Sequence, residues 1–247
     1  MSKVNKNVLQ LKDVSKTYSL QKGKKFEAVK NINLSVKKGE FVSLIGPSGC
    51  GKTTIIKLLA GLIKPSSGVV YEDGKEIRKA TVNRGVVFQN YNLFPWLNVK
   101  ENIEFGLSAL NHEVKNKEKI VEHYIDVMGL KKFINAYPRE LSGGMQQRVS
   151  LARVLATNPS ILLMDEPFSA LDVQTKRFMQ DLLLQICRKE PRTILFVTHD
   201  VEEAVFMSDK VYVMSKHPGT ILTEDTIGLA RPRNLKTEFS KKFIEKK

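Results

Sequence analysis

The sequence is poor in cysteine and tryptophan and contains no long apolar run. Its 247 residues include one tryptophan and two cysteines, Cys50 and Cys187. Two cysteines cannot build a disulfide scaffold, so we expect a reducing compartment. No apolar run reaches the ~18 residues that a membrane span needs, and the first residues hold no apolar secretory core. We therefore expect a chain that is soluble on its own.

Acidic residues are also scarce. The chain has 26 Asp and Glu against 40 Lys and Arg, a net charge of +14. This excess is compatible with nucleic acid, anionic lipid or nucleotide phosphates as partners, and equally with a solvated lysine-rich surface. Hydrophobic residues at 42% and charged residues at 27% are typical of a globular protein. They exclude a disordered chain, a collagen-like chain and a coiled-coil rod.

Short apolar runs alternate with helical patterns along most of the chain. Alternating residues predict strands before residue 37, and buried runs predict strands at 41–45, 85–88, 161–164, 193–197 and 211–214. Helical spacing at 54–62 and 172–188 separates them, which predicts an α/β core with a largely parallel sheet. We expect this core to span 1–90 and 157–227. Residues 91–156 form a predicted helical insertion, and 228–247 a basic tail that is either solvated or close to anionic headgroups.

A glycine-rich loop joins the predicted strand 41–45 to the next helix. It reads Gly46-Pro-Ser-Gly-Cys-Gly-Lys52-Thr53, a G-x-x-x-x-G-K-T pattern in the strand–loop–helix context that a P-loop requires. Its backbone N–H groups and the helix dipole favour phosphate. We predict that Lys52 reaches the β- and γ-phosphates and that the Thr53 hydroxyl binds Mg²⁺. The alternative is a plain strand–turn–helix connection. Cys50 is interpreted as a small spacer rather than a redox thiol.

A second acidic motif follows the apolar run 161–164. Asp165 and Glu166 end this predicted strand. Asp165 fits the Walker B acid that binds Mg²⁺ in P-loop NTPases, and Glu166 could activate a water as general base. Alone, such a pair is weak evidence, because exposed acids commonly end strands.

A third motif lies upstream of these acids and carries a family resemblance. It reads Leu141-Ser142-Gly143-Gly144-Met145 and is followed by Gln146-Gln147-Arg148. With it, the sequence resembles the ATP-binding subunit of ABC transporters over about residues 8–220. The family signature usually ends in Gln, where this chain has Met145. The segments LFPWLNVKENI and MDEPFSALD are most similar to the nitrate, sulfonate and taurine importer group.

The resemblance implies a fold and further site residues. The implied fold is a P-loop NTPase (RecA-like) α/β core with an N-terminal antiparallel β subdomain and an inserted helical subdomain. Gln89 resembles the Q-loop glutamine, His199 the switch histidine and Tyr18 the aromatic that stacks on adenine. The D-loop corresponds to Ser169, Ala170, Leu171 and Asp172. Taken singly, Gln89 could be an ordinary polar residue, His199 a structural histidine and Tyr18 a packing aromatic.

The chemistry implied is hydrolysis of ATP with Mg²⁺ as cofactor. Glu166, His199 and Gln89 are the expected catalytic residues, and Thr53, Gln89 and Asp165 the expected magnesium ligands. The expected ATP contacts are Tyr18, Gly46, Pro47, Ser48, Gly49, Cys50, Gly51, Lys52, Thr53 and Thr54.

The resemblance also implies partners. The chain has one P-loop and one signature, so we expect a homodimer in which Leu141–Met145 of one copy complete the other copy's site. Tyr91, Phe94 and Trp96 are expected to dock a transmembrane permease at the cytoplasmic face of the membrane, unless they only pack the helical region. An extracytoplasmic solute-binding protein would act indirectly, and no nucleic acid is expected.

Three other functions compete with this reading. A soluble ABC ATPase that acts on nucleic acid or ribosomes would suit the charge, but such proteins typically carry two cassettes or extra modules. A P-loop kinase or GTPase has no use for the Leu141–Gly144 motif or His199. A purely structural module would not need every catalytic position filled. The transported solute is not encoded in an ATPase subunit.

Overall fold

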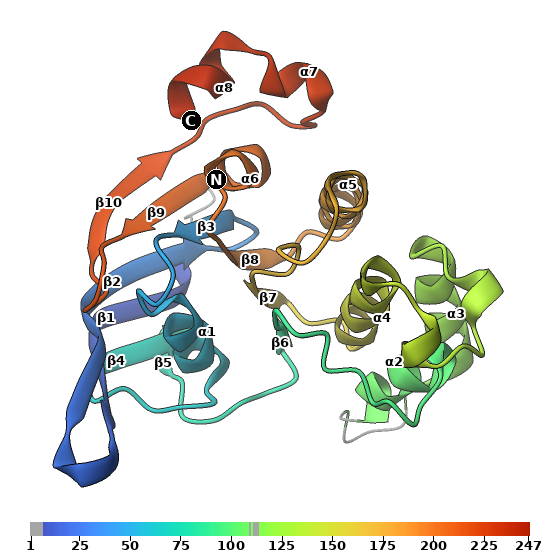
Figure 1. Cartoon of the computed structure of the whole chain (residues 1–247), viewed down its shortest axis with the longest axis horizontal. Coiled ribbons are helices and arrows are strands. Elements are labelled where there is room, and N and C mark those ends of the chain that lie inside the picture. The colour runs from blue at the N-terminus through green and yellow to red at the C-terminus, as the bar shows by residue number, and fades with distance from the viewer. Residues whose placement is uncertain (1–6, 109, 111–113) are drawn as a thin grey trace.

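Two β-sheets and a peripheral group of helices make up the molecule (Figure 1). The computed structural model describes residues 7–108, 110 and 114–247. The first sheet is antiparallel, in the order β2-β1-β4-β5. Its strands are β1 (Asn7–Ser19), β2 (Lys25–Lys37), β4 (Ser67–Glu72) and β5 (Lys75–Glu76). This sheet matches the antiparallel N-terminal region expected from the family.

The second sheet has the order β10-β9-β3-β8-β7-β6 and is parallel except at β10. Its strands are β3 (Phe41–Ile45), β6 (Arg84–Val87), β7 (Ile161–Asp165), β8 (Thr193–Thr198), β9 (Lys210–Met214) and β10 (Ile221–Thr226). Each parallel strand is apolar and buried along nearly its whole length, as strands covered on both faces are. The five predicted runs therefore match strands to within one residue, while β10 was not predicted.

Helices cover the six-stranded sheet and extend from its β6 edge. They are α1 (Lys52–Ala60), α2 (Val99–Ser108), α3 (Lys117–Val127), α4 (Gly143–Ala156), α5 (Val173–Lys189), α6 (Val201–Met207), α7 (Leu235–Glu238) and α8 (Lys241–Lys246). Short 3₁₀ turns lie at Gln21–Gly23, Lys131–Phe133 and Pro138–Glu140. Helices α2, α3 and α4 pack on one another and lie in the chain between β6 and β7. None of the described helices is both long and apolar enough to cross a lipid bilayer.

Two hydrophobic clusters hold these layers together. One fills the space between the sheets, where α1 contacts strands of both and Leu9, Ile32, Leu44 and Ile56 are fully buried. The other lies on the opposite face of the six-stranded sheet, under α4, α5 and α6. Because α1 is packed from both sides, its N-terminal end is held firmly at the carboxyl ends of the parallel strands.

The C-terminal segment is packed rather than fully solvated. Phe243 of α8 is buried against the second cluster, and the Arg233 side chain is buried as well. Arg233 donates to the carbonyl oxygens of Phe206 and Ser208 at 2.9 and 2.7 Å. Glu238 of α7 pairs with Arg177 of α5. This segment therefore links the C-terminal end of α6 to α5.

Candidate functional site

The predicted P-loop runs from β3 to α1 along a tight backbone path. Gly51 precedes α1 with φ +100°, and a Cβ there would lie 2.8 Å from the carbonyl oxygen of Ala28 on β2. Only glycine fits that position. Cys50 is fully buried, and burial raises the pKa of its thiol. A buried neutral thiol suits a spacer and not a redox centre.

Lys52, Glu166 and His199 come together from three segments of the chain. The Lys52 ammonium donates to the carbonyl oxygens of Gly46 and Pro47 at 2.7 and 3.1 Å, and lies 3.6 Å from Glu166 Oε1. Glu166 Oε2 lies 3.0 Å from His199 Nδ1. The carboxylate thus stands between a buried cation and an imidazole that is 59% exposed. Glu166 has φ +45°, a strained conformation for a residue with a side chain.

Asp165 and Thr53 offer oxygen ligands that suit Mg²⁺. Asp165 is the buried last residue of β7, and the Thr53 hydroxyl is near enough to its carboxylate to lower the pKa of that group. Burial raises the pKa of Asp165, and the charge of Glu166 raises it further. A divalent cation would relieve both effects. No group of three or more His, Cys, Asp or Glu side chains in the described residues is arranged so that it could hold a metal ion. This pair suits Mg²⁺, which usually takes few protein ligands and completes its shell with phosphates and water.

Gln89 reaches the D-loop rather than standing alone. Its amide donates to Ser169 Oγ at 3.3 Å, and that hydroxyl donates to the Glu166 carbonyl oxygen at 3.0 Å. Asp172 has a clear structural role, because it caps α5 by accepting from the N–H groups of Gln174 and Thr175. These hydrogen bonds, chiefly those from Thr175, lower the pKa of Asp172.

Tyr18 lies beside the start of α1, where an adenine ring could reach it. Its hydroxyl is 3.4 Å from Thr54 Oγ1, its ring is partly exposed, and Lys16 Nζ lies 5.3 Å from the ring centroid. Tyr18 pairs across β1 and β2 with Phe26, which stacks on His217. Tyr18 thus lies between the antiparallel sheet and the start of α1 as a partly exposed residue.

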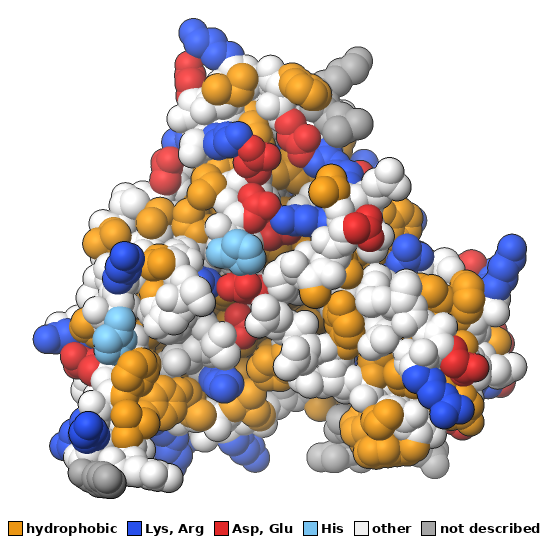
Figure 2. All heavy atoms as spheres, in the orientation of Figure 1, with side chains coloured by type: hydrophobic (Ala, Val, Ile, Leu, Met, Phe, Trp, Pro, Cys, Tyr) orange, Lys and Arg blue, Asp and Glu red, His pale blue; other side chains and the backbone are white. Residues whose placement is uncertain are grey.

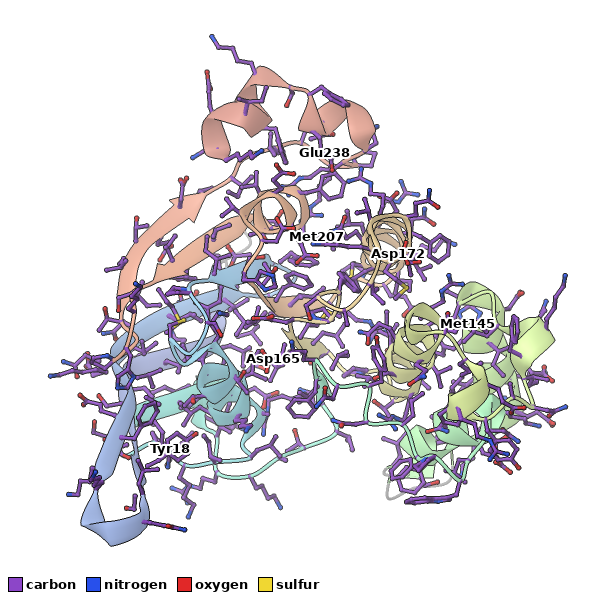
Figure 3. All side chains as sticks on the ribbon, viewed as in Figure 1. Tyr18, Met145, Asp165, Asp172, Met207 and Glu238 are labelled. Atoms are coloured by element: carbon purple, nitrogen blue, oxygen red, sulfur yellow. The ribbon has the colours of Figure 1, made fainter. Side chains whose placement is uncertain are left out.

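The predicted signature loop lies apart from the P-loop, on the helical side of the molecule. Figure 3 shows Met145 on α4, across from Asp165 and Tyr18. Ser142 caps α4 by accepting from the N–H of Met145 at 3.3 Å. A Cβ on Gly144 would lie 2.5 Å from Thr175 Cγ2, so the glycine lets α4 start close to α5. Leu141 is buried and anchors the loop.

Comparison with known families places more than half of the chain, residues 29–169, in one of them, described as ABC transporter. The chain belongs to the ABC transporter family. It is 48% identical to the nitrate import ATP-binding protein of Synechocystis over 90% of this chain and 83% of that protein. It is 44% identical to the aliphatic sulfonates import ATP-binding protein of Bacillus thuringiensis, over 91% and 88% of the two chains.

A solved structure gives the same answer. A dimeric ATP-binding cassette in a post-hydrolysis state with bound ADP and phosphate superposes with a TM-score of 0.79. That match has 35% identity and covers 88% of this chain and 98% of the cassette. This ABC chain is therefore an ATPase that uses ATP and Mg²⁺, and its P-loop NTPase fold agrees with the expectation from the sequence.

In this ABC ATPase, an aromatic cluster lines a groove beside α2 and α4. Phe94 contacts Trp96 and Phe105, with ring centroids 5.6 and 4.3 Å apart, and Trp96 is 69% exposed. Tyr91 and Phe94 line a groove of about 390 Å³. Asn102 fixes the loop by hydrogen bonds with the backbone of Phe94. Trp96 is not packed in the core, whereas Tyr91 and Phe94 are half-buried.

Sequence reasoning missed a polar network behind His199. Lys176 Nζ lies 2.7 Å from Asp200 Oδ2 and 3.5 Å from Glu203 Oε1, and Gln180 donates to Glu203 Oε1. Burial would lower the pKa of Lys176, but its hydrogen bonds to Asp200 and Glu203 and the negative charges of those two carboxylates together raise it. The spacing of Asp200 and Glu203 is that of a helix capping motif, which was the available signal.

Proposed function

We propose that this chain is the ATP-hydrolysing subunit of a membrane importer for small anions of the nitrate or aliphatic sulfonate type. The observation that carries the proposal is its 44–48% identity, over about nine-tenths of its length, to ATP-binding proteins named for those solutes. Its place would be the cytoplasmic face of the membrane, with permease subunits and, indirectly, a solute-binding protein. The units proposed are 1–90 with 157–227, 91–156, and 228–247.

The proposed chemistry divides among the residues that meet at the end of β7. Lys52 exchanges its bonds to the Gly46 and Pro47 carbonyl oxygens for phosphate oxygens. Glu166 takes a proton from the attacking water, and His199 holds the Glu166 carboxylate and the γ-phosphate in register. Thr53, Asp165 and Gln89 would hold Mg²⁺, which offsets phosphate charge when bound. The remaining P-loop residues supply backbone N–H groups, and Tyr18 stacks on the base.

The second half of the site is proposed to come from another copy. Met145 lies on α4, apart from Asp165 near the centre of the molecule (Figure 3), which favours Leu141–Met145 serving the P-loop of another copy. A homodimer in which each copy offers Ser142, Gly143 and Gly144 to the other's γ-phosphate completes two sites with one symmetry axis. The D-loop, Ser169 to Asp172, would lie between them.

The groove lined by Tyr91 and Phe94 is the proposed permease contact. Gln89 is separated from Tyr91 by one residue, Asn90, which also lines the groove, so movement of the Q-loop would reach the groove directly. Half-buried aromatics that line a groove, with the exposed Trp96 in contact with Phe94, are typical anchors of a protein interface. The alternative, an ABC ATPase that acts on nucleic acid, rests on the charge of +14. Figure 2 shows basic side chains scattered singly among acidic ones on the visible face, which offers no continuous track for a polyanion.

The test is to isolate the tagged chain from detergent-solubilised membranes of its native cell and to identify what accompanies it. We expect a multi-span permease and ATPase activity that a solute-binding protein stimulates. Trp96→Ala should leave the ATPase rate of the isolated chain unchanged and reduce recovery of the permease. Ribosomes or nucleic acid without a membrane protein would overturn the proposal, and unchanged recovery with Trp96→Ala would remove the docking role.

A further inference from the structure

A second hollow lies at the opposite end of the six-stranded sheet from the P-loop. It has a volume of about 390 Å³ and is bounded by α5, by the amino ends of β3 and β8, and by residues 231–234. Phe41 and Ile194, near the starts of β3 and β8, line it together with Leu184 of α5. The P-loop follows β3 and His199 follows β8, so both lie at the carboxyl ends of the same strands. This hollow, which we call the arginine crevice, is therefore a separate place on the molecule.

Apolar walls and an excess of positive charge distinguish the arginine crevice. Four arginines and two aspartates line it: Arg188, Arg192, Arg231, Arg233, Asp181 and Asp209. Both aspartates already have cations, since Arg231 Nη2 lies 2.8 Å from Asp209 Oδ1 and Arg177 Nε lies 3.6 Å from Asp181 Oδ2.

One cation at the crevice is uncommitted. Arg188 is exposed and forms no ion pair within the described part of the chain, whereas Arg192 pairs with Glu190. Burial raises the pKa of the neighbouring Cys187 to about 12, so this wall of the crevice carries a neutral thiol and no competing anion. An apolar surface with one free guanidinium is complementary to a molecule that has a short hydrocarbon part and one anionic head.

We propose that the arginine crevice binds a small organic anion, an alkyl sulfonate or carboxylate, that regulates ATP hydrolysis. The head group would pair with Arg188, and the alkyl part would lie against Phe41, Leu184 and Ile194. Inorganic nitrate or phosphate would leave the apolar walls uncovered, and burial of each methylene adds affinity. The ligand class follows from the lining alone and does not depend on which solute the transporter carries.

The crevice touches the far ends of the two helices that begin at the catalytic centre. Helix α5 starts beside Asp172 of the D-loop, and its C-terminal half supplies Leu184 and Arg188. Arg233 lines the crevice and holds the last carbonyls of α6, which starts after His199 and Asp200. A ligand that fixes α5 against residues 231–234 would restrain both helices. Regulation then takes the form of slower ATP turnover when the anion is bound.

The experiment is calorimetric titration of the full-length chain with hexanesulfonate, with and without MgATP. We expect binding that ATP does not displace, weaker binding of methanesulfonate, and none of hexylammonium. Arg188→Gln should weaken binding about tenfold, the usual effect of losing one charge-assisted bond. Lys189→Gln removes the same charge from the next residue, which does not line the crevice, and should leave the affinity unchanged. Leu184→Trp should block the crevice.

Each result of these titrations either supports or overturns the proposal. Equal affinity of hexanesulfonate and hexanoate would indicate regulation by cellular carboxylates, and a preference for the sulfonate would indicate regulation by imported solute. Displacement by ATP, equal affinities for the parent chain and Arg188→Gln, or absence of binding would overturn the proposal. So would an ATPase rate of the parent chain that hexanesulfonate leaves unchanged. These readings use the isolated chain, so they stand apart from the permease recovery that tests the importer.

Discussion

Four helices begin near the site, and they differ in whether a carboxylate caps the N-terminus. This difference separates helix ends that can bind an anion from helix ends that only position other residues. Helix α1 begins after Gly51 with no side-chain cap, and α4 begins after Ser142. Neither has an acidic residue in its first turn. Helices α5 and α6 are instead capped by the carboxylates of Asp172 and Asp200. The positive ends of α1 and α4 thus remain available to an anion, whereas those of α5 and α6 are already neutralised.

The two available ends differ from each other as well. Around α1 lie a lysine and the acids Asp165 and Glu166, the groups that hydrolysis needs. Around the start of α4 lie Tyr91 and Thr175, which offer no acid or base suited to that step. On the proposed function, one chain carries one reacting half and one half that only holds phosphate. The difference is the reason for proposing that two copies pair head to tail.

Removing the base at α1 should have the largest effect. We expect Glu166→Gln to lower the ATPase rate by about 10²–10⁴-fold, the usual worth of a general base. ATP binding should persist, because Lys52 and the P-loop amides are untouched, and the ATP-bound dimer should accumulate. Single-turnover hydrolysis and size-exclusion chromatography with ATP measure both. A variant that hydrolyses ATP at the parent rate would remove Glu166 from the chemistry.

A carboxylate introduced at the start of α4 should neutralise the positive N-terminus of this helix, as Asp172 and Asp200 do for α5 and α6. Ser142→Asp keeps the cap, since Asp caps as well as Ser, but it places a negative charge where phosphate should bind. We expect the thermal stability to be retained, and both ATP-driven dimerisation and hydrolysis to fall about 10²-fold. Ser142→Asn, a neutral cap of the same size, is the control and should retain most activity. Equal activities of the two variants would mean that no phosphate approaches α4.

Mixing two defective chains sharpens the same comparison. Lys52→Ala disables the α1 half, and Ser142→Asp disables the α4 half. In a mixed dimer one site combines two intact halves, so random pairing should restore about a quarter of the parent ATPase rate. The rate is measured against the molar ratio of the two chains. No recovery at any ratio would contradict the exchange of signature loops between copies.

Helices α5 and α6, which are capped by acids, should affect the ATPase rate by positioning His199 and not by binding the nucleotide. Lys176→Met leaves Asp200 and Glu203 without their cation and loosens the segment that carries His199. We expect kcat to fall about tenfold with little change in KM for ATP, because misplacement affects the reacting geometry. Lys176→Arg should restore the rate. Arg177→Gln, the neighbouring residue on α5, is the control, and a loss of kcat there as large as for Lys176→Met would mean that α5 is generally sensitive.

The sequence predicted those elements whose residues are contiguous, namely the buried parallel strands and the P-loop. The apolar runs matched strands to within one residue, because buried parallel strands are read directly from their continuous hydrophobicity. The P-loop could be placed between β3 and α1 since its glycines and Lys52 are contiguous. Strand β10 was not predicted, because five of its six residues are exposed and it pairs only with β9 at the sheet edge. A strand that is exposed along nearly its whole length shows no hydrophobic run, whereas the buried edge strand β6 does.

Contacts between distant segments were beyond the sequence. The left-handed backbone at Glu166 and the pairing of Lys176 with Asp200 depend on how β7, α5 and α6 meet. The buried positions of Arg233 and Phe243 look, in sequence, like part of a basic tail. Each is decided by tertiary packing that a single sequence does not display.

The smallest expected effect is on the stability of the nucleotide-free protein, which the buried Asp165 carboxylate beside α1 lowers at neutral pH. Burial raises the pKa of Asp165 above its ordinary 3.8, so the folded chain binds this proton more tightly than the unfolded chain does. The resulting stability is present at low pH and is lost as pH rises through the raised pKa. Asp165→Asn is always neutral and avoids this loss.

We therefore expect nucleotide-free Asp165→Asn to be more stable than the parent chain at neutral pH, by about 1 kcal/mol, or about 2–4 °C in Tm for a chain of this size. The gain should vanish on acidification below the ordinary range of aspartate. MgATP should reverse the order, because it stabilises the parent chain and binds the variant poorly. Thermal unfolding across pH, with Ser142→Asn as control, measures this. Equal Tm values at neutral pH would show that the buried Asp165 carboxylate does not destabilise the folded chain. The strained backbone of Glu166 would then be the one unfavourable feature named here beside α1, and the described residues at the start of α4 show no counterpart.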